Sequence, residues 1–134
     1  MRSLVFLTAT LFASISEAAT LDIVVEGLET KGRLRLALVD SEDTWRGKGE
    51  PLVGINARVT ASTMKFRFEV PAGKMAVRLY HDENANGELD SNMLGIPKEG
   101  YGFSNNPKVM GPAGFKDAVF TVTAKGTTTV IKVN

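Results

Sequence analysis

Hydrophobic and polar residues alternate with a period of two along most of the chain after residue 19. This alternation is typical of β-strands that bury one face and expose the other. Turn-forming residues, such as those at 31–32, 71–73 and 125–126, fall between the alternating segments. The strands that the pattern predicts span residues 21–26, 33–38, 55–60, 65–70, 75–80, 118–124 and 127–133.

These segments predict an all-β fold. About seven short strands in a chain of 134 residues favour a two-sheet antiparallel β-sandwich of the immunoglobulin or transthyretin type. A small barrel is the main alternative. No stretch shows a helical periodicity, and no repeat or shift in composition divides the chain. We therefore expect a single domain over residues 19–134.

Residues 1–18 have the layout of a secretory signal peptide. Arg2 supplies a positive charge, an apolar run follows from Leu4 to Phe12, and the small residues Ser16 and Ala18 precede a cleavage point. A membrane anchor is the alternative, but the run is much shorter than the roughly 20 residues that span a bilayer. We expect a periplasmic or secreted protein with no membrane span after signal cleavage.

Composition narrows the possible chemistry. The chain has no cysteine and a single histidine, which excludes disulfides, thiol nucleophiles, zinc–thiolate sites and multi-histidine metal sites. Lysine and arginine number 16 against 15 aspartate and glutamate, so the formal net charge is +1. This near balance argues against a nucleic-acid-binding protein.

Arginine recurs on the polar faces of the predicted strands, at Arg33, Arg35, Arg58, Arg67 and Arg78. We expect solvated sheet faces whose charges discourage edge-to-edge aggregation. An anion-binding surface is the alternative, and the balance of charge over the whole chain disfavours it.

Trp45 lies in the polar connection between residues 40 and 52. Its large side chain has to hide most of its area, so we expect it to close one end of the sandwich. An exposed Trp45 would instead indicate a contact surface.

The alternation breaks at HDENANGELD, residues 81–90, directly after the fifth predicted strand. Oxygen-bearing side chains stand at alternate positions and a glycine follows, as in the calcium loop D-x-[DN]-x-[DN]-G. Calcium takes 6–8 oxygen ligands, and short Asp and Asn side chains let a tight loop wrap them around one ion. The predicted Ca²⁺ ligands are Asp82, Asn84, Asn86, Asp90 and Glu88, the last through its carbonyl.

The match to a calcium loop is incomplete. The twelfth position, where an EF-hand has a bidentate Glu, holds Met93, and no flanking helices are predicted. Asn86-Gly87 is also a strong hairpin-turn signal, and Asx side chains close turns without any metal. The sequence therefore leaves open a weak Ca²⁺ site and a metal-free Asx turn.

Residues 91–114 show no clear strand or helix, which is unusual inside a compact domain. Gly100 and Gly102 flank Tyr101, an arrangement that would allow sharp backbone changes around an aromatic anchor. We expect the ion or the Asx network to hold this excursion at one end of the sandwich, with Glu99 as a further ligand or as the residue that pins the loop. The binding surface expected there comprises His81, Tyr101, Phe103, Ser104, Asn105 and Asn106.

The run HDENANGELD, followed by GIPKEGYGFSNN at residues 95–106, resembles a family of secreted bacterial proteins, domain-of-unknown-function family 2141. The family's pattern is a strand ending in His-Asp-Glu-Asn-x-Asn-Gly-x-Leu-Asp, which leads into Gly-Ile-Pro-x-Glu-Gly-Tyr-Gly-Phe-Ser. VPAG at residues 70–73 resembles the family's Pro-x-Gly turn, and FKDA at residues 115–118 resembles its entry to the closing strands. The resemblance implies an extracytoplasmic β-sandwich and supplies no activity.

We do not expect an enzyme. Ser104 and His81 could be grouped with Asp82 or Asp90 as nucleophile, base and acid, but nothing resembles a nucleophile elbow. Adjacent residues of a strand also point to opposite faces, which separates His81 from Asp82. The function we expect is a binding or interaction module for a glycan, a peptide or an envelope protein. A metal-free structural protein of the cell envelope is the alternative, followed by a hydrolase.

Overall fold

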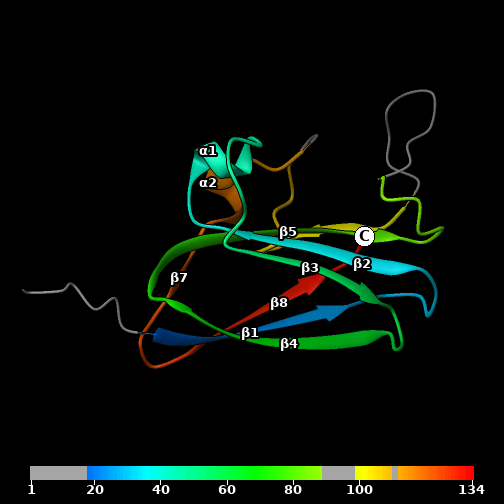
Figure 1. Ribbon diagram of the computed structural model, residues 1–134, viewed down its shortest axis with the longest axis horizontal. Coiled ribbons are helices and arrows are strands. Elements are labelled where there is room, and N and C mark those ends of the chain that lie inside the picture. The colour runs from blue at the N-terminus through cyan, green and yellow to red at the C-terminus, as the bar shows by residue number, and fades with distance from the viewer. Residues whose placement is uncertain (1–17, 89–98, 110–111) are drawn as a thin grey trace, which may run out of the picture.

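The computed structural model describes residues 18–88, 99–109 and 112–134, which form strands and two short helices in two layers (Figure 1). The signal peptide predicted at residues 1–18 lies outside these residues except for Ala18. The elements are β1 (Ala18–Glu26), β2 (Arg33–Val39), α1 (Glu42–Trp45), β3 (Val53–Arg58), β4 (Thr63–Pro71), β5 (Gly73–Asp82), β6 (Tyr101–Phe103), α2 (Phe115–Ala118), β7 (Phe120–Val122) and β8 (Thr127–Lys132).

Two sheets pack face to face and confirm the predicted all-β sandwich. One sheet has the strand order β4-β1-β8, and the other has the order β3-β2-β5-β6, with β7 paired to β5. Every pair is antiparallel except β1 with β8, which is parallel and differs from our prediction. The chain crosses from one sheet to the other between β7 and β8, and a crossing of this kind can deliver a strand in either direction, whereas a hairpin cannot.

The core lies between the inner faces that the alternation predicted. Leu21, Ile23 and Val25 of β1 are fully buried, and they face Leu34 and Leu38 of β2 across the sandwich. Exposed or half-buried residues alternate with them along both strands. The period of two was therefore sufficient to identify which face of each strand is inside.

A second apolar cluster covers the outer face of the five-stranded sheet at one end. Val39 and Ala76, which pair across β2 and β5, are fully buried beneath Trp45. The rings of Phe103 and Phe115 lie 5.9 and 6.2 Å from the Trp45 ring. Trp45 is thus buried as we expected, but it seals the outer side of one sheet rather than the gap between the two.

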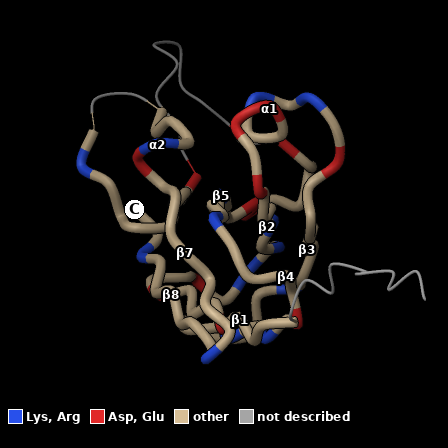
Figure 2. Tube along the Cα trace, turned by 90° about the vertical axis from the view of Figure 1, so that its left-hand side faces the viewer, with Lys and Arg blue, Asp and Glu red and all other residues tan. Residues whose placement is uncertain are grey.

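Helices α1 and α2 hold this cluster in place. Each has four residues, which is too short to leave a helical periodicity in the sequence and explains why neither was predicted. Ser41 caps α1 by accepting a hydrogen bond from the Thr44 N–H. Figure 2 shows the acidic residues of the two helices at this end of the molecule. No helix among the described residues is long and apolar enough to cross a membrane.

Strand β6 lies inside the stretch for which no strand was predicted. It pairs with β5 through Tyr101 and Tyr80, and it passes close to β8. A Cβ atom on Gly102 would lie 2.7 Å from the Ile131 side chain, so only glycine fits between the sheets there. Gly102 therefore serves close approach, not the sharp backbone change that we predicted for it, and a three-residue strand with a central glycine has almost no alternation to detect.

Candidate functional site

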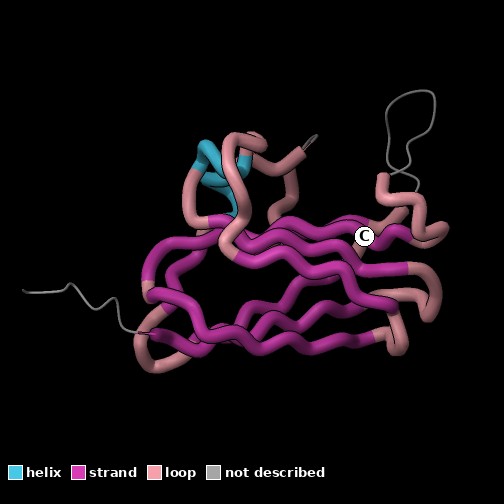
Figure 3. The backbone as a smooth tube through the Cα atoms, in the orientation of Figure 1, coloured by secondary structure: helices cyan, strands magenta, loops and turns pink. Residues whose placement is uncertain are grey.

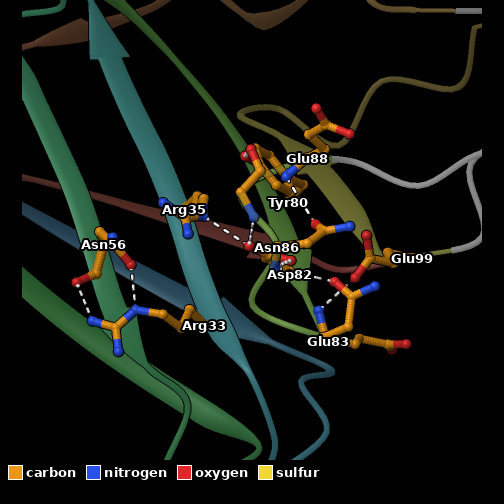
Figure 4. Close-up of polar contacts among 11 residues, drawn as sticks. Arg33, Arg35, Asn56, Tyr80, Asp82, Glu83, Asn86, Glu88 and Glu99 are labelled. Carbon is orange, nitrogen blue, oxygen red and sulfur yellow. Dashed lines mark hydrogen bonds and ion pairs between the residues drawn. The ribbon is translucent and has the colours of Figure 1, made fainter.

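The predicted site begins with Asp82, the last residue of β5, whose side chain is fully buried (Figure 4). One carboxylate oxygen accepts hydrogen bonds from Arg35 Nε at 2.9 Å and from the Gly87 N–H at 2.7 Å. The other oxygen accepts a hydrogen bond from the Asn86 N–H at 3.0 Å. Asp82 thus joins β2, β5 and the following loop in one buried network.

The network sets the charge state of Asp82. Burial by itself raises the pKa of this carboxyl, but the hydrogen bonds from Gly87, Arg35 and Asn86 stabilise the carboxylate more strongly. The pKa of Asp82 therefore lies below its usual range, and the buried group is ionised at neutral pH.

The loop after Asp82 is a succession of Asx turns. Asn84 Oδ1 accepts a hydrogen bond from the Asn86 N–H at 3.3 Å, and Asn86 Oδ1 accepts one from the Glu88 N–H at 2.9 Å. Ala85 and Gly87 adopt positive φ angles of 55° and 84°, which gives the backbone its sharp turn. The alternating Asp and Asn side chains suggested metal ligands. In the structure their oxygens accept hydrogen bonds from backbone N–H groups of the same loop.

Hydrogen bonds at Glu99 and Gly100 attach the chain just before β6 to the end of β5 and the loop after it. Glu99, only 6% exposed, accepts a hydrogen bond from the Glu83 N–H at 2.6 Å. The backbone N–H of His81 donates to the Gly100 carbonyl at 2.7 Å. The His81 ring is buried, and its Nε2 lies 2.6 Å from the Lys31 carbonyl oxygen. The structure therefore brings Glu99 to the loop formed by residues 82–88.

Ser104, Asn105 and Asn106 have structural hydrogen bonds. The fully buried Ser104 hydroxyl accepts from the Val77 N–H and donates to the Ala118 carbonyl at 2.5 Å. Asn105 donates to the carbonyls of Asp117, in α2, and Val119, directly after it. Asn106 accepts from the Lys132 N–H and donates to the Val130 carbonyl at the edge of β8.

This placement changes the predicted binding surface. His81 and Ser104 lie in the interior with backbone partners, so they are removed from the exposed surface that we predicted, and they do not form a nucleophile–base pair. Tyr101 and Phe103 are half-buried on the outer face of β6, with ring centroids 5.9 Å apart, and remain available.

Arg35 is the site residue that the sequence reasoning missed. We assigned its charge to a solvated face, yet the side chain is only 26% exposed and pairs with the buried Asp82. Both residues occupy outward positions of neighbouring strands, β2 and β5. Only the register between β2 and β5 shows that Arg35 can reach Asp82, and the alternation of hydrophobic and polar residues does not predict that register.

The described residues offer limited support for a metal. Among residues 18–88, 99–109 and 112–134, no group of three or more His, Asp or Glu side chains could hold an ion. Asp82 already neutralises a guanidinium, which competes with a cation for the same oxygens. The predicted ligand Asp90 lies outside the described residues. Ca²⁺ binding stays a prediction.

Comparison with known proteins places the chain in a family. Residues 23–130 match the sequence profile of the family described as "Uncharacterized protein conserved in bacteria (DUF2141)". No curated protein and no solved structure matches the chain. The matched segment includes the Asp82 loop, Glu99 and both sheets of the sandwich. The chain therefore belongs to this bacterial family, as its central motif suggested.

Proposed function

We propose that this chain is a non-catalytic binding module that works outside the cytoplasm and presents a ligand surface beside the Asp82 loop. One observation carries the proposal. The half-buried Tyr80 and Tyr101 are held beside the loop of residues 83–88, which the Arg35–Asp82 ion pair anchors. The Tyr80 hydroxyl donates to the Gly87 carbonyl at 2.9 Å, and Tyr80 pairs across strands with Tyr101. Aromatic side chains held rigidly on a sheet favour binding because little conformational entropy is lost.

The position of this surface supports the same function. The loop of residues 83–88 and the two helices rise from the outer side of the five-stranded sheet at opposite ends (Figures 1 and 3). Loops on a rigid sandwich are common places for recognition. A glycan, a peptide or an envelope protein is the class of partner that we propose.

The proposed location rests on the sequence of residues 1–18, which has the layout of a secretory signal peptide. The absence of cysteine means that packing and polar networks such as that of Asp82 have to stabilise the fold without disulfides.

An array of glycans and peptides tests the binding function. We expect reproducible ligands for the purified chain, and we expect Tyr101→Ala to lose them because Tyr101 is one of the half-buried aromatic residues that form the surface. Val130→Ala changes an exposed residue on the outer face of the other sheet and should keep every ligand. Silence of the wild-type array would favour the alternative, a structural protein of the cell envelope.

Calcium at the same loop is a second candidate, supported by the alternating Asx oxygens of residues 82–86. For a dissociation constant of about 10⁻⁴ M, 10 mM calcium should stabilise the protein by about 2.7 kcal/mol. We expect a corresponding rise in melting temperature, lost in Asn84→Ala and not reproduced by magnesium. Superimposable melts in calcium and EDTA would leave the loop as a metal-free Asx turn.

A further inference from the structure

Arginine residues have different cross-strand partners on the two outer faces of this sandwich. On the three-stranded sheet, Arg67 lies directly across from Asp22 and donates two hydrogen bonds to its carboxylate, at 2.8 and 3.3 Å. Opposite charges facing each other across strands stabilise a sheet, and this is the arrangement expected of a solvated face.

On the five-stranded sheet, like charges face each other instead. Arg33 of β2 is the direct cross-strand partner of Arg58 of β3. Directly opposed side chains have Cβ atoms about 4.5–5.5 Å apart, and like charges at that separation destabilise a sheet. Arg35 follows two residues after Arg33 on the same face, so three guanidinium groups gather on neighbouring strands.

The charge of this group is not balanced locally. Asp82, the partner of Arg33 on its other side, pairs with Arg35 and is fully buried. Among the residues that the structure describes, Arg33 donates to the neutral side-chain and backbone oxygens of Asn56, at 2.5 and 3.0 Å, as Figure 4 shows. Within the described part of the chain, neither Arg33 nor Arg58 forms a salt bridge.

Among the described residues, two acidic side chains at this end of the sheet, Glu29 and Glu83, are engaged by a lysine. Lys31 pairs with Glu29 at 3.0 Å and with Glu83 at 3.9 Å at this end of the sheet. Burial is the main cause of the raised pKa of the Tyr80 phenol, and the negative charge of Glu88 contributes to it. Arg33, held by Asn56, and the exposed Arg58 are therefore a repulsive cross-strand pair, and a bound anion would relieve that repulsion.

We propose that the outer face of the five-stranded sheet binds a carboxylate-bearing polysaccharide, with Arg33 and Arg58 as the anion-binding residues. Guanidinium groups match the planar fork of a carboxylate. The next row along the sheet runs from Asn56 on β3 through Arg35 on β2 and Tyr80 on β5 to Tyr101 on β6. Its amide and two phenols are suited to the hydroxyls and apolar faces of sugar rings. This row spans four strands, or about 14 Å.

A nucleic acid is the competing polyanion, and the charge of the chain disfavours it. Nucleic-acid binding depends on many phosphate contacts and a strongly basic protein surface. The formal net charge here is only +1. The inference names the ligand class of the proposed binding function and rests on it.

The test measures binding of hexagalacturonate to the purified chain in EDTA at low salt, by calorimetry. The controls are the methyl ester of the same hexasaccharide, which keeps the sugars and removes the charge, and hexathymidylate. We expect the acid to bind about tenfold or more tightly than either control, because paired charge-assisted hydrogen bonds are lost with the ester. Equal binding of the ester or of hexathymidylate, or no binding of the acid, would overturn the proposal.

Matched variants locate the site. Arg33→Gln/Arg58→Gln should weaken hexagalacturonate binding about tenfold or more, whereas Lys65→Gln/Arg67→Gln, with the same change of net charge on the other sheet, should leave it nearly unchanged. Equal losses in both would reduce the effect to bulk charge and reject the site. Because the first pair of substitutions removes a repulsion, its melting temperature in the absence of ligand should equal or exceed that of the wild type.

A single substitution provides a second route if the double variant does not fold. Arg58→Gln changes an exposed residue at an edge strand and should lower the affinity in the same direction. Unchanged affinity in Arg58→Gln would contradict the assignment. Array ligands that depend on Tyr101, found together with no binding of hexagalacturonate, would keep the binding function and reject only its anionic class.

Discussion

Replacing Asp82 by alanine is expected to lower the free energy of unfolding by about 3 kcal/mol. The substitution leaves the Arg35 guanidinium without its counter-ion and removes the acceptor of the Asn86 and Gly87 N–H groups. Breaking a buried ion pair by removing one partner costs more than the pair itself contributes, because the remaining charge stays desolvated. Arg35 is 26% exposed, which places the expected loss at the lower end of the range for fully buried pairs. Urea unfolding followed by circular dichroism measures it.

The pH dependence of the same variant identifies the cause. Because the pKa of Asp82 in the folded protein lies below its unfolded value of about 3.9, ionised Asp82 stabilises the fold above that pH. This contribution is lost as the pH falls through the folded-state pKa. We therefore expect the difference in stability between wild type and Asp82→Ala to shrink below about pH 4. A difference that stays constant from pH 7 to pH 3 would show that the ion pair is not responsible.

Replacing Trp45 by alanine is expected to cost about 3–4 kcal/mol. Trp45 is 8% exposed and packs against Val39 and Ala76, with the Phe103 and Phe115 rings beside it. The substitution would leave a cavity over the outer face of the five-stranded sheet. It would also remove the ring that lies 5.5 Å from the Arg78 guanidinium.

Trp45→Phe is the control for this prediction. It keeps an aromatic ring in the cluster and removes the indole N–H, which donates to the Ala113 carbonyl at 3.3 Å. Its cost should be clearly smaller than that of Trp45→Ala. A loss below about 1 kcal/mol for Trp45→Ala would contradict the burial of this side chain.

Trp45 is the single tryptophan of the chain, so its fluorescence reports the unfolding of the end of the sheet that it covers. Comparing wild type with Asp82→Ala then shows whether the two ends of the sheet unfold together.

Much of the candidate site was visible in the residues themselves. The run from His81 to Gly87 breaks the alternation with closely spaced Asx residues, and these do close the loop beside β5. What their oxygens face could not be predicted, because an Asx side chain accepts a backbone N–H or a cation through the same atom. The interior positions of His81 and Ser104 also escaped prediction, since serine is mostly exposed in folded proteins and histidine is intermediate in its burial.

The sequence by itself determined that the fold is all-β, which face of each long strand is buried, and where the chain departs from regular structure. These properties are local, because they follow from a period of two and from turn residues that act over a few positions. Only the tertiary structure decided that Arg35 neutralises Asp82, that Arg33 opposes Arg58, and that Trp45 covers the outside of one sheet. Such pairings depend on register and strand order between segments far apart in the chain, and a side chain's own sequence neighbours carry no record of its cross-strand partner.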